Sequence, residues 1–175
     1  MKILPPERGE YGDFYDGYVS LVRETPDIVD TLERQLMPVQ VLKNLTEQQA
    51  GSRYADGKWS VRQVLGHMAD AERIFGYRLL RVARADETPL PGFDENSFVD
   101  HAGFDARPVA SLADELAIVR QGSLMLIRGL EDVTLLRRST INNTPATTRA
   151  LIFILAGHFA HHLAVLRDRY KIENL

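Results

Sequence analysis

Cysteine is absent from the 175 residues of this chain. Without cysteine the chain can form no disulfide bond, offers no thiolate ligand to a metal ion and has no cysteine nucleophile. Any thiol that takes part in its chemistry must therefore come from another molecule.

An excess of positive charge is also lacking, since the formal net charge is −3 and the isoelectric point is about 6.0. A protein that binds nucleic acid usually presents a basic field to the phosphates. The sequence therefore predicts no nucleic-acid partner, and we expect a small-molecule substrate instead.

Long apolar runs are missing too. The N-terminal segment MKILPPERGEYGDF lacks the apolar stretch of a secretory signal peptide. The longest apolar run, ALIFILAG at 150–157, falls well short of the roughly 18 residues of a membrane-spanning helix. These features predict a cytoplasmic protein with no membrane partner.

The length and the composition, with 45% hydrophobic and 26% charged residues, are those of one globular domain. Residues 1–24 are rich in proline and glycine near their start, and we expect them to lie over the fold as an N-terminal arm. Residues 25–175 show no internal repeat and no change of composition, which predicts a single domain.

Apolar residues recur at three- and four-residue spacing in four segments, which predicts helices at about 26–44, 60–85, 111–130 and 147–170. Thr25 is the expected N-cap of the first, and Pro38 should kink or interrupt it. Ser60 with Gln63 forms a capping box for the second, and Thr147 is a candidate cap for the fourth. No run alternates convincingly between apolar and polar residues. The predicted fold is therefore all-α, an antiparallel four-helix bundle with at most a short extended piece.

The histidines carry the strongest chemical signal. Only five are present, and three of them fall within GHFAHH on the last predicted helix: His158, His161 and His162. His158 and His162 are four residues apart, so their imidazoles project from one helical face and can reach one ion. Both interrupt an otherwise apolar stripe, as His67 does on the second helix. A shared metal would satisfy all three buried rings at once.

Other interpretations of the histidines stay open. An inward histidine is often only a core residue that is hydrogen-bonded to a carbonyl or a carboxylate. His161 could replace His162 as the partner of His158, although packing beside the site or donating to a substrate fits it better. His101 falls in a predicted loop and is expected on the surface.

Three segments resemble the DinB superfamily. DGKWSVRQVLGHMADAE at 56–72 resembles the start of the helix that carries the family's first histidine ligand. GHFAHHLAVL at 157–166 resembles its His-x-x-x-His helix. ETPLPGFDENSF at 87–98 is similar to a Pro-Tyr-Asp-Glu stretch of the YfiT branch, which includes thiol S-transferases. The resemblance covers about 25–170, with the motifs in the family's order.

The resemblance implies a four-helix bundle with a three-histidine metal site, whose ligands map onto His67, His158 and His162. Two positions depart from the pattern. Phe93 stands where the branch has tyrosine, and Gly66 stands where YfiT-like proteins often have a further histidine.

Three imidazoles would leave a divalent ion with open positions, the arrangement of catalytic rather than structural sites. Imidazole ligands suit zinc, nickel, copper and iron, so the ligand type does not settle the ion, and zinc or nickel is the one we expect. Asp70, one turn after His67, could orient a ligand ring or relay a proton, but it could equally be a solvated surface carboxylate. Glu95 lies in the long connection at about 87–110, where it could approach the site or serve only as an acidic turn residue. We take Asp70 and Glu95 as the candidate catalytic residues.

Two remaining features are expected to be structural. Trp59 should pack as a hydrophobic staple beside the Ser60 cap. The second helix should present a charged outer face made of four arginines: Arg73, Arg78, Arg81 and Arg84.

The function predicted from these residues is that of a divalent-metal-dependent enzyme. It would transfer a low-molecular-weight thiol to an electrophile or hydrolyse a small substrate. The alternative is a non-catalytic bundle that binds a metal or a ligand. A homodimer is also expected, with Ile74, Phe159 and Leu163 as candidate interface residues.

Overall fold

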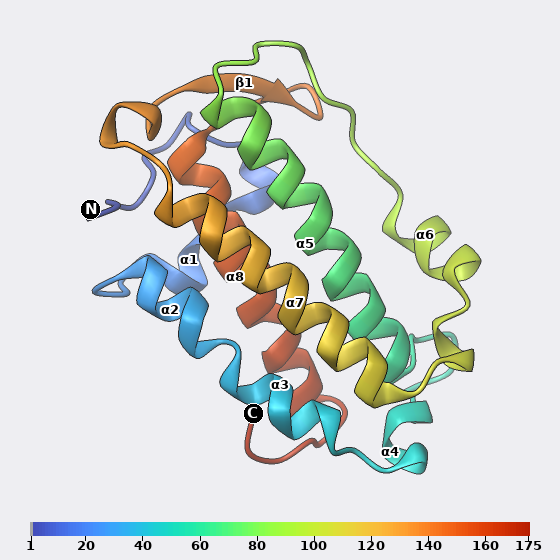
Figure 1. Cartoon of the computed structure of the whole chain (residues 1–175). Coiled ribbons are helices and arrows are strands. Elements are labelled where there is room, and N and C mark those ends of the chain that lie inside the picture. The colour runs from blue at the N-terminus through green and yellow to red at the C-terminus, as the bar shows by residue number, and fades with distance from the viewer. Residues whose placement is uncertain (1) are drawn as a thin grey trace.

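The computed structural model describes residues 2–175 and shows a four-helix bundle, as predicted (Figure 1). Three of its helices are long and continuous, and the fourth is built from two short helices. The long helices are α5 (Val61–Ala83), α7 (Val109–Arg128) and α8 (Thr148–Asp168), and the short pair is α2 (Ile28–Arg34) and α3 (Met37–Lys43).

Pro38 explains why the first predicted helix is broken. It occupies the first turn of α3, where a missing N–H costs nothing, and the chain turns at Gln35 and Leu36 just before it. The predicted N-cap was wrong, because α2 begins two residues later than expected. The cap is Asp27, whose carboxylate accepts from the backbone N–H groups of Val29 and Asp30.

The caps of α5 and α8 are confirmed. Ser60 Oγ accepts from the backbone N–H of Gln63, and the Gln63 side chain accepts in return from the backbone N–H of Ser60. Thr147 Oγ1 accepts from the backbone N–H of Ala150. These caps fix where the two histidine-bearing helices begin.

The four helices do not alternate in direction along the chain. At one end Arg62 Nε donates to the carbonyl oxygen of Arg107 at 3.0 Å, and at the other Arg137 donates to the carbonyl oxygen of Ala83. Helices α5 and α7 therefore run parallel, while α8 and the α2–α3 pair run the opposite way (Figure 1). The connection at 84–108 makes this possible because it returns along the length of the bundle.

Short elements complete the chain. They are α1 (Asp16–Val22), α4 (Glu47–Gly51), α6 (Glu95–Ala102), β1 (Arg138–Ile141), β2 (Thr144–Thr147) and the 3₁₀ turns Asp13–Tyr15, Phe104–Ala106 and Asp132–Thr134. The strands form one antiparallel hairpin, in which Arg138 pairs with Thr147. Asn142 and Asn143 make its turn with φ of 50° and 60°, a left-handed geometry that asparagine tolerates. Sheet is thus confined to this one short piece among the described residues.

The N-terminal segment, expected as an arm, contributes a helix that packs on the bundle. Helix α1 lies against α8 so closely that a Cβ on Gly157 would collide with the carbonyl oxygen of Tyr18. Glu10 anchors the segment to the start of α8 by accepting from Thr147 Oγ1 and from Arg149. Burial alone would raise the pKa of Glu10, but these hydrogen bonds bring the pKa down to about 2.

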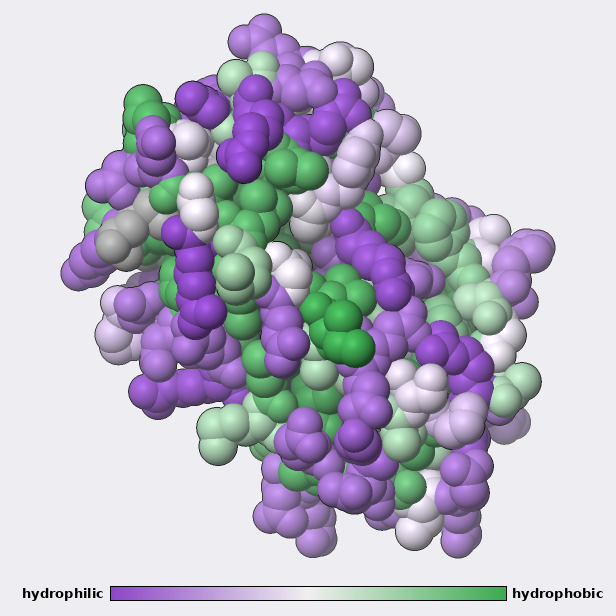
Figure 2. All heavy atoms as spheres, viewed as in Figure 1, coloured by the Kyte–Doolittle hydropathy of each residue, from purple (hydrophilic) through white to green (hydrophobic). Residues whose placement is uncertain are grey.

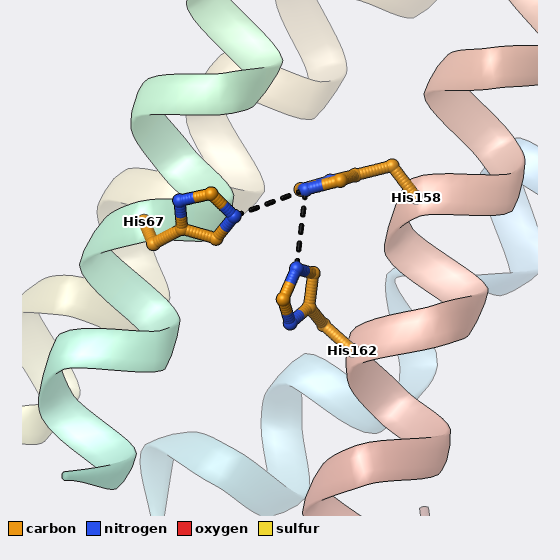
Figure 3. A group of neighbouring side chains, drawn as sticks. All are labelled: His67, His158 and His162. Atoms are coloured by element: carbon orange, nitrogen blue, oxygen red, sulfur yellow. Dashed lines mark hydrogen bonds between the residues drawn. The ribbon is translucent and has the colours of Figure 1, made fainter. Parts of the chain in front are cut away.

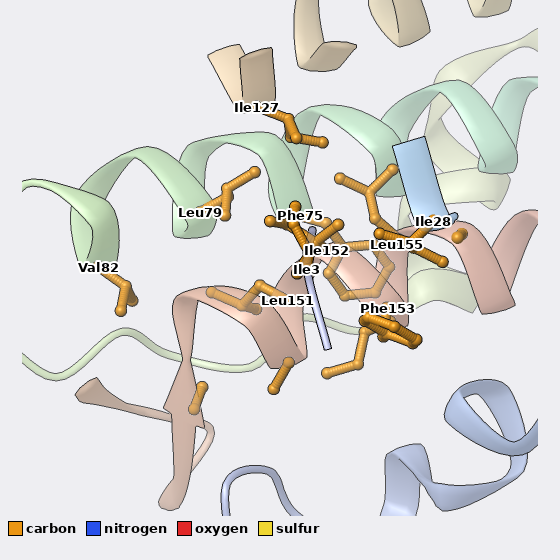
Figure 4. Close-up of a cluster of buried hydrophobic side chains, with 14 of the residues drawn as sticks. Ile3, Ile28, Phe75, Leu79, Val82, Ile127, Leu151, Ile152, Phe153 and Leu155 are labelled. Atoms are coloured by element: carbon orange, nitrogen blue, oxygen red, sulfur yellow. The ribbon is translucent and has the colours of Figure 1, made fainter. Parts of the chain in front are cut away.

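The hydrophobic core has two parts. One lies toward the hairpin and includes residues of α1, α2, α5, α7 and α8, and Figure 4 shows part of it. The other lies toward α3 and the C-terminus. Helix α8 is long and apolar enough to cross a membrane, but 67% of its most apolar 18-residue window is buried inside the bundle. It is therefore the core helix of this fold. Hydrophilic side chains cover most of the face shown in Figure 2. Phe159, predicted at a dimer interface, is only 1% exposed and belongs to the core, because its ring packs under the guanidinium of Arg120.

Candidate metal centre

Three imidazole nitrogens meet between α5 and α8 (Figure 3). The Nε2 atom of His158 lies 3.1 Å from Nε2 of His67 and 3.1 Å from Nε2 of His162. One ring nitrogen from each residue lies within 4.8 Å of the others, and all three residues are buried. The structure thus brings together the three histidines that the sequence singled out.

Helix geometry and aromatic packing position the three rings. His158 and His162 lie one turn apart on α8, and His67 faces them from α5. The ring of Trp59 packs on His67 with a centroid distance of 4.8 Å, and Phe75 meets His158 edge-on at 5.4 Å. These contacts hold the rings with their Nε2 atoms toward one point.

Burial keeps these imidazoles neutral. Burial, and less strongly the charge of His161, lowers the pKa of His67 to about 4. Burial lowers the pKa of His158 and of His162 well below the usual histidine range, and the other histidines of the cluster add to the effect. A neutral imidazole is the form that binds a metal ion.

The donor set fits a divalent ion better than it fits a hydrogen-bonded cluster. A ring nitrogen carries either one hydrogen or one lone pair, so His158 Nε2 can bond to one of its two neighbours but not to both. Two ligands about 2.0–2.1 Å from a tetrahedral zinc ion are separated by about 3.3 Å, close to the 3.1 Å between these nitrogens. His162 Nδ1 is buried and has no hydrogen-bond partner in residues 2–175. Hydrogen bonding within the protein therefore leaves this cluster unsatisfied.

A cavity of about 440 Å³ opens onto the three histidines, which is within the size range of small-molecule sites. Its walls are mainly aromatic and come from α1, α5, α8, the hairpin turn and the connection after α5. Besides the three histidines it is lined by Phe14, Tyr15, Tyr18, Trp59, Phe75, Arg78, Gly92, Phe93, Glu95, Asn142 and His161. The long connection after α5 thus forms part of the cavity wall.

The two carboxylates proposed from the sequence lie in different places. Glu95 lines the cavity at the start of α6. Burial, followed by the negative charge of Glu95, raises the pKa of Tyr18, so Glu95 acts electrostatically on the cavity wall. Asp70 does not line the cavity. It is half-buried and accepts from Arg73 at 3.4 Å on the side of α5 that faces Glu115, so the structure gives it no contact with the imidazoles.

The two remaining histidines lie in different places. His161 is half-buried in the cavity wall, and its ring packs against Tyr18 at 5.4 Å. It also lines a second, smaller cavity of about 280 Å³, which shares His162 and Trp59 with the first. His101 is exposed, as predicted, although it lies on α6 rather than in a loop, with Nδ1 at 2.7 Å from the carbonyl oxygen of Ser97.

One cavity residue was placed wrongly from the sequence. Arg78 was expected on the outer face of α5 but is only 3% exposed and lines the cavity, because the connection after α5 covers it. Trp59 packs against the core cluster at the start of α5, as a staple would, and in addition it lies against His67 and lines both cavities.

Three aromatic residues of the N-terminal segment were missed altogether: Phe14, Tyr15 and Tyr18. The available signal was Gly157, a glycine inside the histidine motif that lets α1 approach. Gly66 also has a steric reason, since a Cβ there would collide with the ring of Phe104. Any larger residue at position 66 would therefore require the Phe104 ring to move.

Comparison with known proteins agrees with this geometry. The sequence model of the DinB superfamily matches residues 33–166. A protein of Oceanobacillus iheyensis is 26% identical over 172 residues, which cover 94% of this chain and 96% of the relative. One of Bacillus pumilus is 25% identical over 134 residues, which cover 75% of each chain. Both are named "putative metal-dependent hydrolase".

A solved structure shares the fold. YfiT from Bacillus subtilis superposes with a TM-score of 0.72 at 20% identity, over 95% of this chain and 91% of its own. It is described as a probable metal-dependent hydrolase with an unusual four-helix bundle topology.

Proposed function

The chain belongs to the DinB superfamily, and on that premise we propose that it is a divalent-metal-dependent enzyme that hydrolyses a small molecule. The observation that carries the proposal is the convergence of three buried Nε2 atoms on an aromatic cavity. The names of the relatives support the same class of reaction.

His67, His158 and His162 would hold the ion through Nε2, with zinc or nickel as the expected metal. When bound, such an ion supplies Lewis acidity that polarises a substrate and makes a nucleophile more acidic. The aromatic walls exclude bulk water and orient the substrate. Glu95 accepts the proton that the attacking nucleophile loses, since it is the carboxylate that lines the cavity.

Transfer of a low-molecular-weight thiol is the second candidate, and one feature favours it. Two cavities meet at His161, His162 and Trp59, which leaves room for two separate organic molecules. Hydrolysis needs only one, so the smaller cavity has no evident use in a simple hydrolase. The thiol would come from outside, because the chain has no cysteine.

A paired activity screen tests the proposal. The zinc- and nickel-loaded protein is assayed on a panel of esters and amides, and then with glutathione or cysteine and an electrophile such as a chloronitrobenzene. Glu95→Gln should lower kcat by about 100-fold, a typical general-base effect, without changing metal content. The matched control is Glu87→Gln, an exposed residue outside the cavity lining. Full metal occupancy with no turnover in either screen would favour the non-catalytic binding bundle.

Two further expectations stay predictions. A cytoplasmic location is consistent with a bundle whose most apolar helix is buried in its own core. The homodimer loses Phe159 as an interface residue but keeps Ile74 and Leu163, which are partly buried. Sedimentation that shows only monomer at high concentration would reject it.

A further inference from the structure

Arg78 is a buried cation without a counter-ion. Its side chain is almost fully covered, and no carboxylate in residues 2–175 forms an ion pair with it. The other fully buried arginine, Arg120, has its charge balanced by Glu72 at 2.8 Å. Burying an unpaired charge is costly, so an uncompensated arginine in a cavity wall needs an explanation.

The protein orients Arg78 without neutralising it. Nη2 donates to the carbonyl oxygen of Pro91 at 2.7 Å, and Nη1 reaches the hydroxyl of Tyr15 at 3.4 Å. The guanidinium carbon lies 5.8 Å from the ring centre of Phe75 and 5.6 Å from that of Phe93. Cation–π contacts and neutral acceptors fix the position of the group but leave its positive charge in place. Of the five N–H donors of the guanidinium, several stay free for a ligand.

The surroundings of Arg78 complete an end of the cavity. Asn142, at the tip of the hairpin turn, lines the same cavity and offers an amide donor. The turn is tied to the connection after α5, because Leu90 N donates to the carbonyl oxygen of Thr140 and Asn142 N donates to that of Leu90, both at 2.9 Å. Glu95 lines the cavity as well but makes no ion pair with Arg78. This end of the cavity therefore combines a charged donor with a neutral one.

One aromatic ring separates this end from the histidines. Phe75 lies edge-on to His158 with a centroid distance of 5.4 Å, and the same ring receives the cation–π contact of Arg78. A molecule that binds Arg78 can thus extend along Phe75 and reach the three imidazoles with a group about one ring away.

We propose that Arg78, assisted by Asn142, binds an anionic group of the substrate, a carboxylate or a phosphate-type oxyanion. The guanidinium suits either, because its N–H groups form paired, charge-assisted hydrogen bonds to two oxygens. The substrate class is therefore a small organic anion whose reacting group lies about one aromatic ring from its charge. This inference rests on the proposed function only in taking the cavity as the substrate site, and it needs no metal.

Trp59 gives a direct readout, because it is the only tryptophan of the chain and lines the cavity. Metal-free protein is titrated with benzoate, with phenylphosphonate and with benzamide as the neutral analogue, and the fluorescence of Trp59 is followed. The better anion should bind at least about 10-fold more tightly than benzamide, the value of one charged hydrogen bond. Benzoate and phenylphosphonate separate a carboxylate site from a phosphate-type site.

Variants test whether Arg78 is the source of the preference for the anion. Arg78→Met should reduce the ratio of anion to benzamide affinity to about one, and Arg78→Lys should keep part of the preference. Arg84→Met is the matched control, because Arg84 is the exposed C-cap residue of α5 and lies outside the cavity lining. If Arg78→Met does not fold, two results still test the proposal. They are the ratio of anion to benzamide affinity in the wild type and the change in that ratio in Asn142→Ala, at the exposed turn.

Equal binding of anion and benzamide by the wild type, no binding of either anion, or an unchanged preference in Arg78→Met overturns the proposal. Because the titration uses metal-free protein, its failure leaves the metal centre untouched. Loss of the metal centre would likewise leave the anion preference standing.

Discussion

The bundle contains two buried polar clusters, and they solve the same physical problem in opposite ways. One consists of His67, His158 and His162. The other consists of Glu72 on α5, Arg120 on α7 and Gln35 at the end of α2. Both interrupt apolar helix faces, and both lie between elements far apart in the sequence.

The second cluster is closed in the sense that its charges are balanced within the protein, although Glu72 Oε1 and Arg120 Nε have no hydrogen-bond partner in residues 2–175. Arg120 donates to Glu72 Oε2 and to Gln35 Oε1, both at 2.8 Å, and Gln35 Nε2 donates to the carbonyl oxygen of Ala156 at 2.8 Å. The Arg120 guanidinium also lies 4.4 Å from the ring centre of Phe159. Its charges are balanced, and its partners come from three helical segments, so its role is to hold the bundle together.

The histidine cluster is left open by the protein. Its nitrogens face one another with no carboxylate, carbonyl or hydroxyl partner at Nε2 in residues 2–175, and a cavity leads to them. A polar cluster whose charges the protein itself balances is structural, whereas one whose nitrogens face only one another beside a cavity is built for a ligand. This comparison yields four predictions, in order of expected effect.

The largest effect should be on metal affinity. His158→Ala removes the central ligand and should weaken zinc binding at least about 1,000-fold, well beyond the 10–100-fold typical when a hydrogen-bond partner of a ligand is lost. Isothermal titration with zinc measures it, and the exposed His101→Ala is the control that should bind normally. A full equivalent of tightly bound zinc in His158→Ala would show that the cluster is not the metal site.

Breaking the closed cluster should instead affect folding. Arg120→Met leaves Glu72 buried without its partner and should lower the free energy of unfolding by about 3–5 kcal/mol. Urea denaturation measures the change, while the folded fraction should still bind one zinc per chain. A loss of stability no greater than that of the exposed Arg128→Met would contradict the structural role of the pair.

The open cluster should make the metal-free protein sensitive to acid. The folded state holds the pKa of His67 at about 4, below the usual value near 6.5, so the unfolded chain takes up protons first as the pH falls. The free energy of unfolding should be constant above about pH 7 and fall by about 3 kcal/mol for this residue between pH 6.5 and 4. Urea titrations across that range measure the slope. His67→Gln should make the slope shallower, with His158 and His162 still contributing, and His101→Ala should leave it unchanged; equal slopes in all three proteins would refute the linkage.

The smallest effect tests how the cavity wall is held against the histidine helix. Gly157→Ala forces α1 away from α8 and should cost about 1–3 kcal/mol, as overpacking does elsewhere. Gly122→Ala is the matched control, because a Cβ there meets nothing, and it should stabilise α7 by up to about 1 kcal/mol. Thermal unfolding separates the two. A neutral Gly157→Ala would mean that α1 does not approach α8 as closely as described.

The local signals in the sequence predicted much of this site. The four-residue spacing of His158 and His162, together with apolar neighbours, was enough to place both rings on the inward face of one helix. The caps at Ser60 and Thr147 were also readable, because capping depends on residues within three positions. Capping and the inward face of an apolar helix depend on nearby residues, and for that reason these two features could be predicted from the sequence.

Features that depend on distant contacts were not readable in the same way. The aromatic wall from α1 depends on a contact about 140 residues away at Gly157, and the burial of Arg78 depends on how the connection after α5 folds back. The length of that connection could have indicated the direction of α7 relative to α5. A chain of this length can span the roughly 35 Å of a 23-residue helix, which lets α7 run parallel to α5.

The most direct test of the metal centre is anomalous diffraction from crystals grown with one equivalent of zinc, recorded on both sides of the zinc absorption edge. We expect one strong peak at about 2.0–2.2 Å from the Nε2 atoms of His67, His158 and His162. The side chain of Asp70 should lie outside the coordination sphere. A peak at another site, or no peak between α5 and α8 in protein that has bound zinc, would contradict the central claim.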